Sequence, residues 1–171
     1  MTLGNPSDSR SELDRLMDQY GSLLLRMSAL YLKDADLAQD AVQETFLKAY
    51  RRLNDFRGEC SEKTWLTTIC INTCRDMLRT AWFRHQSRTD IDSLPEKPAD
   101  FAFPDDTVLT EVMRLPAKYR EVILLRYYEG LKLKETASAL GLSDGRVRSR
   151  LNKANGILRD RLKEWYYDER S

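Results

Sequence analysis

The feature that most constrains the fold is a proline-rich stretch in the middle of the chain. Residues 85–106 contain three prolines and six acidic residues against two basic ones, and their apolar residues keep no period of 3.6 or 2. Such a composition is typical of a linker, because it offers no face to bury. We therefore expect two small domains, residues 1–85 and 107–171, joined by a flexible acidic linker over residues 86–106.

Apolar residues on both sides of this linker recur every three or four positions, the period of one helix face. These repeats predict helices over residues 13–30, 38–53 and about 63–83. The inner stripe of the first is Leu13, Leu16, Met17, Tyr20, Leu23, Leu24, Met27 and Leu30, and that of the third is Leu66, Ile69, Cys70, Thr73 and Met77. Because no stretch alternates as a strand would, the predicted fold class is all-α.

The second domain carries the pattern of a helix-turn-helix. Pro116 suits the first turn of a helix and Gly130 its left-handed cap, and a short helix is expected over residues 133–140. Gly141 then supplies a tight turn and Ser143 the N-cap of a final helix. The buried stripe of that helix is Val147, Leu151, Ala154 and Leu158. In such a motif the second helix enters the major groove of DNA.

The outward face of this final helix is basic. It presents Arg146, Arg148, Ser149, Arg150 and Lys153. Arginine can contact guanine with two hydrogen bonds, serine a base or a phosphate, and lysine the backbone. A merely solvated basic face is the alternative, but the motif spacing favours DNA binding. One departure is Thr136, which stands before the small Ala137 where an apolar residue is usual.

The formal net charge of +1 conceals a strong segregation of charge. Residues 34–44 hold four acids and no base, residues 48–88 nine bases and four acids, and residues 146–163 seven bases and one acid. This bipolar pattern indicates more than one macromolecular partner.

Three segments together resemble the ECF (extracytoplasmic-function) sigma factors of bacterial RNA polymerase. They are DLAQDAVQETFLKAYRRLNDF, RGECSEKTWLTTICINTCRDMLR and LPAKYREVILLRYYEGLKLKETASALGLSDGRVRSRLNKA, and the resemblance spans about residues 13–162. It implies a sigma2 helical bundle in residues 1–85, which binds core polymerase and the minus-ten promoter element. It also implies a sigma4 helix-turn-helix domain in residues 107–171, which binds the minus-thirty-five element and the polymerase flap.

The resemblance further assigns roles to side chains of the first domain. The contact with the polymerase clamp helices falls on Asp36, Asp40, Gln43 and Glu44. Their spacing places three of them on one helix face, where they offer acceptors to a basic partner, although a solvated acidic face is the alternative. Minus-ten recognition falls on Arg57, Lys63, Trp65, Asn72, Arg75 and Arg79. Trp65 can equally be a core residue.

Four positions depart from the family pattern. Glu62 stands where an aromatic residue is usual, Thr67 and Thr68 replace a tyrosine and a basic residue, and Arg146 replaces a common threonine. These departures leave open which base the minus-ten pocket reads, and they predict an idiosyncratic minus-thirty-five preference.

The expected function is that of an alternative sigma factor that directs promoter-specific transcription initiation in a stress or envelope response. The resemblance also implies an anti-sigma factor as a further partner. The alternative is a conventional helix-turn-helix regulator that binds a duplex operator without polymerase. Dimerisation, usual for such a regulator, would need a heptad seam, and none is visible.

We expect no enzymatic activity, no cofactor and no metal site. The carboxylates at positions 36, 40 and 44 lack the Glu-x-x-His partners of a di-metal bundle, and His85 is the single histidine. Cys60, Cys70 and Cys74 form no CxxC pair, which leaves a core or a redox role open for them. Residues 1–19 contain several charged residues and no unbroken apolar core, so we expect a cytoplasmic protein without membrane insertion.

Overall fold

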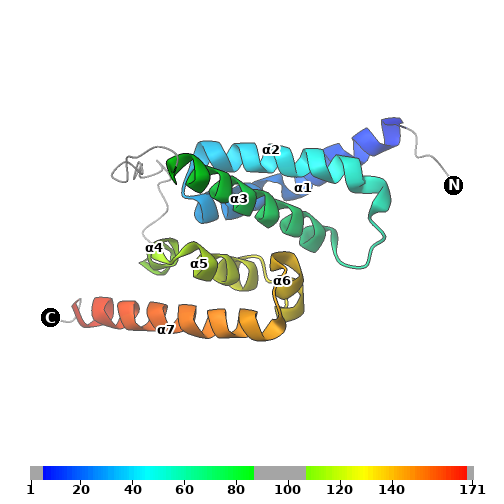
Figure 1. Cartoon of the computed structure of the whole chain (residues 1–171). Helices are drawn as coiled ribbons and strands as arrows, with labels where there is room; N and C mark the ends of the chain where they lie inside the picture. Colours follow the sequence, from blue (N-terminus) through cyan, green and yellow to red (C-terminus); the bar gives the residue numbers. More distant parts are fainter. Residues whose placement is uncertain (1–5, 87–106, 169–171) are drawn as a thin grey trace. The chain divides into compact units, whose positions relative to one another are not determined.

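The computed structural model describes residues 6–86 and 107–168, and within these ranges every regular element is a helix (Figure 1). The chain divides into two compact units, residues 1–99 and 100–171. This confirms the predicted all-α fold with two helical domains. The expected linker lies almost wholly in residues 87–106, outside the described residues, and the domain boundaries at 85 and 107 stay a prediction.

The first unit is a bundle of three long helices. These are α1 (Pro6–Leu32), α2 (Ala35–Arg52) and α3 (Glu62–Gln86), and a short 3₁₀ helix η1 (Leu53–Asp55) follows α2. Each long helix packs against the other two. Leu24, Ala38 and Leu66 are fully buried where the three helices meet. The alanine on α2 allows close approach, because its small side chain keeps the helix axes near one another.

Local capping decides where α2 and α3 begin. The Asp34 carboxylate accepts hydrogen bonds from the backbone N–H groups of Asp36 and Leu37 at 2.9 and 3.0 Å. The Ser61 hydroxyl accepts one from the N–H of Thr64 at 3.0 Å. Both caps satisfy N–H groups that the first helical turn leaves without intrahelical partners. One of the four acids in the acidic segment is therefore a structural cap.

Most of the predicted core of the first unit is buried, whereas Leu13, Tyr20, Leu23 and Met77 are half-buried and Met17 is exposed. Its side chain is 45% exposed, so the prediction that it faces the core is wrong. The side of α1 that faces the core follows positions 16, 20, 24 and 27. Met17 comes directly after Leu16 and lies beside this row, toward solvent. An apolar residue next to a helix stripe costs little when it stays in water.

The two cysteines of α3 face the core, one of the two roles that the sequence left open for them. The Sγ of Cys70 lies 3.1 Å from the Ser28 hydroxyl, and the Cys74 thiol donates to the same oxygen at 3.5 Å. The Cys70 thiol and burial together raise the pKa of Cys74, so its thiol stays protonated. All three cysteines are free of disulfides.

The second unit consists of shorter helices around α7. They are α4 (Thr107–Arg114), α5 (Ala117–Ile123), the π-helical η2 (Leu124–Tyr128), α6 (Leu133–Leu140) and α7 (Asp144–Asp168). The sequence predicted one helix from Pro116 to Gly130. Its α-helical part ends earlier, because the N–H of Glu129 bonds to the carbonyl of Leu124, five residues back, at 2.9 Å. Gly130 ends this segment at a φ of +69°.

The predicted turn between α6 and α7 is present. Gly141 adopts a left-handed φ of +64°, and the N–H of Leu142 returns to the carbonyl of Ala137 at 2.9 Å. This pair is a Schellman cap, which favours glycine at that position. The Ser143 hydroxyl then accepts from the N–H of Arg146 at 3.2 Å and starts α7. Thr136 is fully buried, with its hydroxyl satisfied by the Lys132 carbonyl at 3.0 Å.

Candidate nucleic-acid interface

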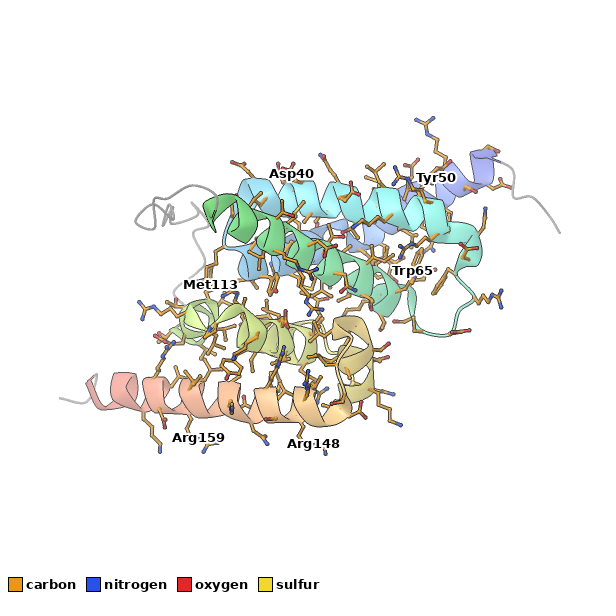
Figure 2. The ribbon with its side chains drawn as sticks, viewed as in Figure 1. Asp40, Tyr50, Trp65, Met113, Arg148 and Arg159 are labelled. Carbon is orange, nitrogen blue, oxygen red and sulfur yellow. The ribbon has the colours of Figure 1, made fainter. Side chains whose placement is uncertain are left out.

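Helix α7 is held with its basic side outward. The stripe predicted to be buried is buried, at Val147, Leu151, Ala154 and Leu158. Arg146, Arg148, Ser149 and Lys153 are exposed, and Figure 2 labels Arg148 on this helix. The N-terminal half of α7 therefore presents cations and a hydroxyl, the groups that read major-groove edges and phosphates.

This basic row lines a shallow hollow shared with α5. Its volume is about 200 Å³, and its walls are Lys118, Tyr119, Arg146, Ser149, Arg150 and Lys153. Sequence reasoning missed the first two residues. The Nζ of Lys118 lies 5.0 Å from the centre of the Tyr119 ring. Only the packing of α5 against α7 brings these side chains to the basic row.

Arg150 differs from the rest of the row because part of its guanidinium is already engaged. Its Nη1 lies 3.2 Å from the carboxylate of Glu121 on α5. The Glu121 side chain is 4% exposed and that of Arg150 26%. A buried carboxylate needs a charged partner. Arg150 thus joins the two helices while it lines the hollow.

In the first unit, an aromatic pair marks the predicted minus-ten region. The rings of Phe56 and Trp65 stack with centres 4.6 Å apart and planes inclined by 25°. Trp65 is half-buried, so it belongs neither to the deep core nor to the open surface. A pocket of about 320 Å³ opens beside it, lined by Asp55, Phe56, Arg57, Glu59, Cys60 and Trp65.

Two of the predicted minus-ten residues, Arg57 and Trp65, line this pocket, and the others lie along α3. Lys63, Asn72 and Arg75 are half-buried and Arg79 is exposed. The side-chain amide of Asn72 donates to the backbone carbonyl of Thr68 at 2.9 Å. Phe56 was missed, although its aromatic ring beside the turn glycine Gly58 was a signal that could have found it.

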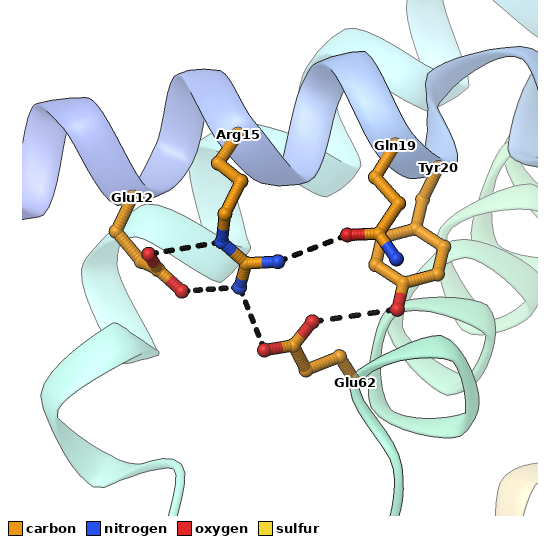
Figure 3. Close-up of polar contacts among 5 residues, drawn as sticks. All are labelled: Glu12, Arg15, Gln19, Tyr20 and Glu62. Carbon is orange, nitrogen blue, oxygen red and sulfur yellow. Dashed lines mark hydrogen bonds and ion pairs between the residues drawn. The ribbon is translucent and has the colours of Figure 1, made fainter.

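Glu62, one of the departures noted above, takes part in a polar cluster at the start of α3 (Figure 3). Its carboxylate accepts from the Arg15 guanidinium at 2.7 Å and from the Tyr20 hydroxyl at 3.3 Å. Arg15 also donates to Glu12 and Gln19. These hydrogen bonds lower the pKa of Glu12 and raise that of Arg15, while partial burial and then the charge of Glu62 raise the pKa of Tyr20.

The acidic face of α2 continues into an apolar one. Asp36, Asp40 and Gln43 are exposed in a row, whereas Glu44 is half-buried beside it. The same spacing of three and four residues leads on to Leu47, 51% exposed, and Tyr50, 41% exposed. Figure 2 labels Asp40 and Tyr50 on this helix. We call Asp36, Asp40, Gln43, Leu47 and Tyr50 the α2 stripe. Its apolar end was missed, although Leu47 and Tyr50 continue the spacing of the residues before them, a signal that could have found them.

Among residues 6–86 and 107–168, no helix is long and apolar enough to span a membrane. The same part of the chain shows no cluster of three or more histidine, cysteine or acidic residues arranged to hold a metal ion.

Comparison with known proteins finds matches to one family in both units of the chain. Residues 16–84 match the family Sigma-70 region 2, and residues 106–154 match Sigma-70, region 4. The RNA polymerase sigma-H factor of Pseudomonas aeruginosa is 32% identical over 82% of this chain and 81% of its own. The RNA polymerase sigma-E factor of Streptomyces coelicolor is 34% identical over 81% and 79%.

Solved structures show the same fold. The sigma factor RpoE of Bartonella quintana, in complex with the anti-sigma factor NepR, superposes with a TM-score of 0.73 at 24% identity, over 89% of this chain and 97% of its own. CnrH, in complex with the cytosolic domain of CnrY, has a TM-score of 0.65 at 26% identity, over 94% and 91%. From the two family matches, the relatives and the site geometry it follows that the chain belongs to the ECF sigma factors, the alternative sigma factors that direct transcription initiation.

Proposed function

We propose that the two units of this sigma factor divide promoter recognition between them, and that α2 joins the protein to core RNA polymerase. The protein is a binding factor without catalytic chemistry of its own, and it acts in the cytoplasm, where polymerase acts. The single observation that carries the proposal is the exposed basic row of α7, held outward by a capped helix-turn-helix.

In the second unit, α7 reads the minus-thirty-five element. Arg146 and Ser149 lie in the first two turns of α7, the part of a recognition helix that reaches base edges. Lys153 and, across the hollow, Lys118 are placed to contact phosphates on either side. Arg150 contributes from a fixed position, because its ion pair with Glu121 restricts its rotamers.

In the first unit, the pocket beside Trp65 holds an unstacked minus-ten base. An aromatic ring offers stacking to any base, and the polar groups around it offer hydrogen bonds to one base edge. Arg57 at the pocket and Arg75 and Arg79 along α3 follow the backbone of the opened strand. Asn72 lies one turn before Arg75 on the same face of α3.

Promoter opening requires polymerase as well. Opening about ten base pairs at about 1.4 kcal/mol per step costs on the order of 14 kcal/mol. Capture of one or two bases returns only a few kcal/mol. The α2 stripe is therefore as necessary as the DNA-binding surfaces, because it brings in the contacts of polymerase that supply the difference.

A second protein that covers these surfaces would keep the factor inactive. CnrH, 26% identical to this chain, is solved with the cytosolic domain of CnrY bound. We propose a partner of the same kind, an anti-sigma factor, and the exposed apolar end of the α2 stripe is the surface that such a partner would cover.

Run-off transcription tests the proposal. Core polymerase is incubated with a pool of genomic promoter fragments, with the protein, without it, or with an Arg146→Ala variant. Promoter-specific transcripts that need the protein, and that decline about ten-fold with the variant as expected for one base contact, support the proposal. Duplex binding that is indifferent to polymerase, without transcripts, would instead identify a conventional regulator.

A further inference from the structure

The polar cluster of Figure 3 links two helix starts that are far apart in the sequence. Arg15 lies in the third turn of α1, and Glu62 is the first residue of α3. The guanidinium contacts three side chains at once, namely Glu12, Gln19 and Glu62. Tyr20 donates to the second carboxylate oxygen of Glu62. Glu62 is thus held from two sides by α1.

The cluster adjoins the pocket. Five of the six residues that line the pocket lie between positions 55 and 60, and the sixth, Trp65, lies one turn after Glu62 on α3. Ser61, which caps the helix, separates the loop from Glu62. Any shift of the first turn of α3 relative to α1 therefore moves Trp65. The loop that carries Phe56 joins the N-terminal end of that same turn.

Stability alone does not account for this arrangement. The Arg15 and Glu62 side chains are 42% and 33% exposed, and ion pairs so exposed add little to the stability of a fold. A guanidinium held by three acceptors is nevertheless a strong geometric constraint, because its planar fork fixes the direction of each hydrogen bond. A constraint of this kind fixes the relative position of α1 and α3 more than it adds to the stability of the fold.

We propose that Arg15 and Glu62 are a positioning pair, which holds the first turn of α3 against α1 and thereby sets the shape and base selectivity of the pocket between Phe56 and Trp65. The inference rests on the proposed role of this pocket in minus-ten recognition. Neither residue touches the base itself.

Trp65 fluorescence reports the pocket without any transcription. The chain has three tryptophans, so the full chain with Trp82→Phe and Trp165→Phe retains Trp65 as its sole tryptophan, which is excited selectively on the red side of tyrosine absorption. In this background, Arg15→Met and Glu62→Ala are each expected to raise acrylamide quenching of Trp65 about two-fold, the scale of one exposed ion pair. Glu62→Gln gives an intermediate result, because its amide oxygen still accepts one hydrogen bond. Asp18→Asn, an exposed acid of α1, is the matched control and leaves quenching unchanged.

Selectivity is then measured with the holoenzyme on promoters that carry each base at the minus-ten positions. Both single variants are expected to reduce the preference for the best base about two- to five-fold, with unchanged affinity for core polymerase. The effect of the double variant should be smaller than the sum of the two single effects, because both single variants remove the Arg15–Glu62 contact.

Unchanged quenching in both single variants overturns the positioning role. Altered quenching with unchanged base preference overturns the selectivity role. If the unmodified protein directs no promoter-specific transcription, the proposed function fails instead, and the quenching result still decides whether the pair sets the pocket.

Discussion

At the scale of single residues, Arg150 shows how one side chain can serve two requirements. It lines the hollow on α7 and it pairs with the buried Glu121 of α5. Removal of the arginine would take this ion pair away from a carboxylate that is 4% exposed. The loss of DNA binding in such a variant would then mix lost contacts with lost structure.

Arg150→Ala is therefore expected to lower the free energy of unfolding by about 1–3 kcal/mol, the usual cost of depriving a buried polar group of its partner. Arg146→Ala, at an exposed position of the same row, should leave stability within about 0.5 kcal/mol. Urea titration of the full chains measures both. Equal stabilities would show that Glu121 finds another partner or water.

At the scale of elements, the turn between α6 and α7 depends on one backbone conformation. Gly141 has a φ of +64°, and an added Cβ would meet nothing within 4 Å. The need for glycine here is thus conformational and not a matter of space. The turn sets the angle between α6 and α7. Strain at this residue therefore changes the orientation of the whole DNA-binding surface on α7.

Gly141→Ala should destabilise the second unit by about 1–2 kcal/mol, the cost of a left-handed conformation for a residue with a Cβ. Gly156→Ala is the matched control within α7, where an added Cβ also meets nothing within 4 Å. It should stabilise by about 0.5–1 kcal/mol, because alanine loses less entropy in a helix. Thermal unfolding followed by circular dichroism distinguishes the two, and a stabilised Gly141→Ala chain would contradict the account.

Helix α2 is the second element whose exposed face invites a test. Leu47→Ala and Tyr50→Ala are each expected to weaken binding to core polymerase about ten-fold, because apolar anchors dominate such interfaces at about 1–2 kcal/mol or more each. Neither should change the melting temperature, since both side chains are largely exposed. Arg52→Ala, exposed on another face of α2, is the control. Unaltered affinity in both variants would remove the apolar end of the stripe from the interface.

At the scale of the whole molecule, two weak promoter contacts, one from each unit, are expected to combine into specific promoter binding. When both units are held on polymerase, the second promoter contact becomes intramolecular, and its effective concentration rises to about the millimolar range. The free chain lacks this advantage and relies on a few phosphate contacts.

The free protein should accordingly bind a promoter duplex weakly, with an affinity that falls steeply as salt rises, because released counterions supply most of that affinity. The holoenzyme on the same duplex should bind at least about a hundred-fold more tightly, the lower range for linked sites. Fluorescence anisotropy at 50 and 200 mM salt compares them. Tight, salt-insensitive binding by the free chain would contradict this account.

The local signals in the sequence were sufficient for the helices and for the turn. The periodic apolar residues, Gly141 and Ser143 act on neighbours within five positions, so their effect can be derived without any knowledge of packing. The π-helical end after Ile123 was not predictable, because a register shift of one backbone hydrogen bond leaves no mark in the apolar pattern.

By itself, the sequence determined an all-α chain in two parts, a helix-turn-helix and the residue types of its outward row. The tertiary structure alone decided which side chains share a site. Lys118 joins the basic row, Glu121 restrains Arg150 across 29 positions, and Arg15 reaches Glu62 across 47. Such contacts depend on how whole helices pack against one another. Periodicity can show which face of a helix is buried, but it does not identify the residue that the face meets.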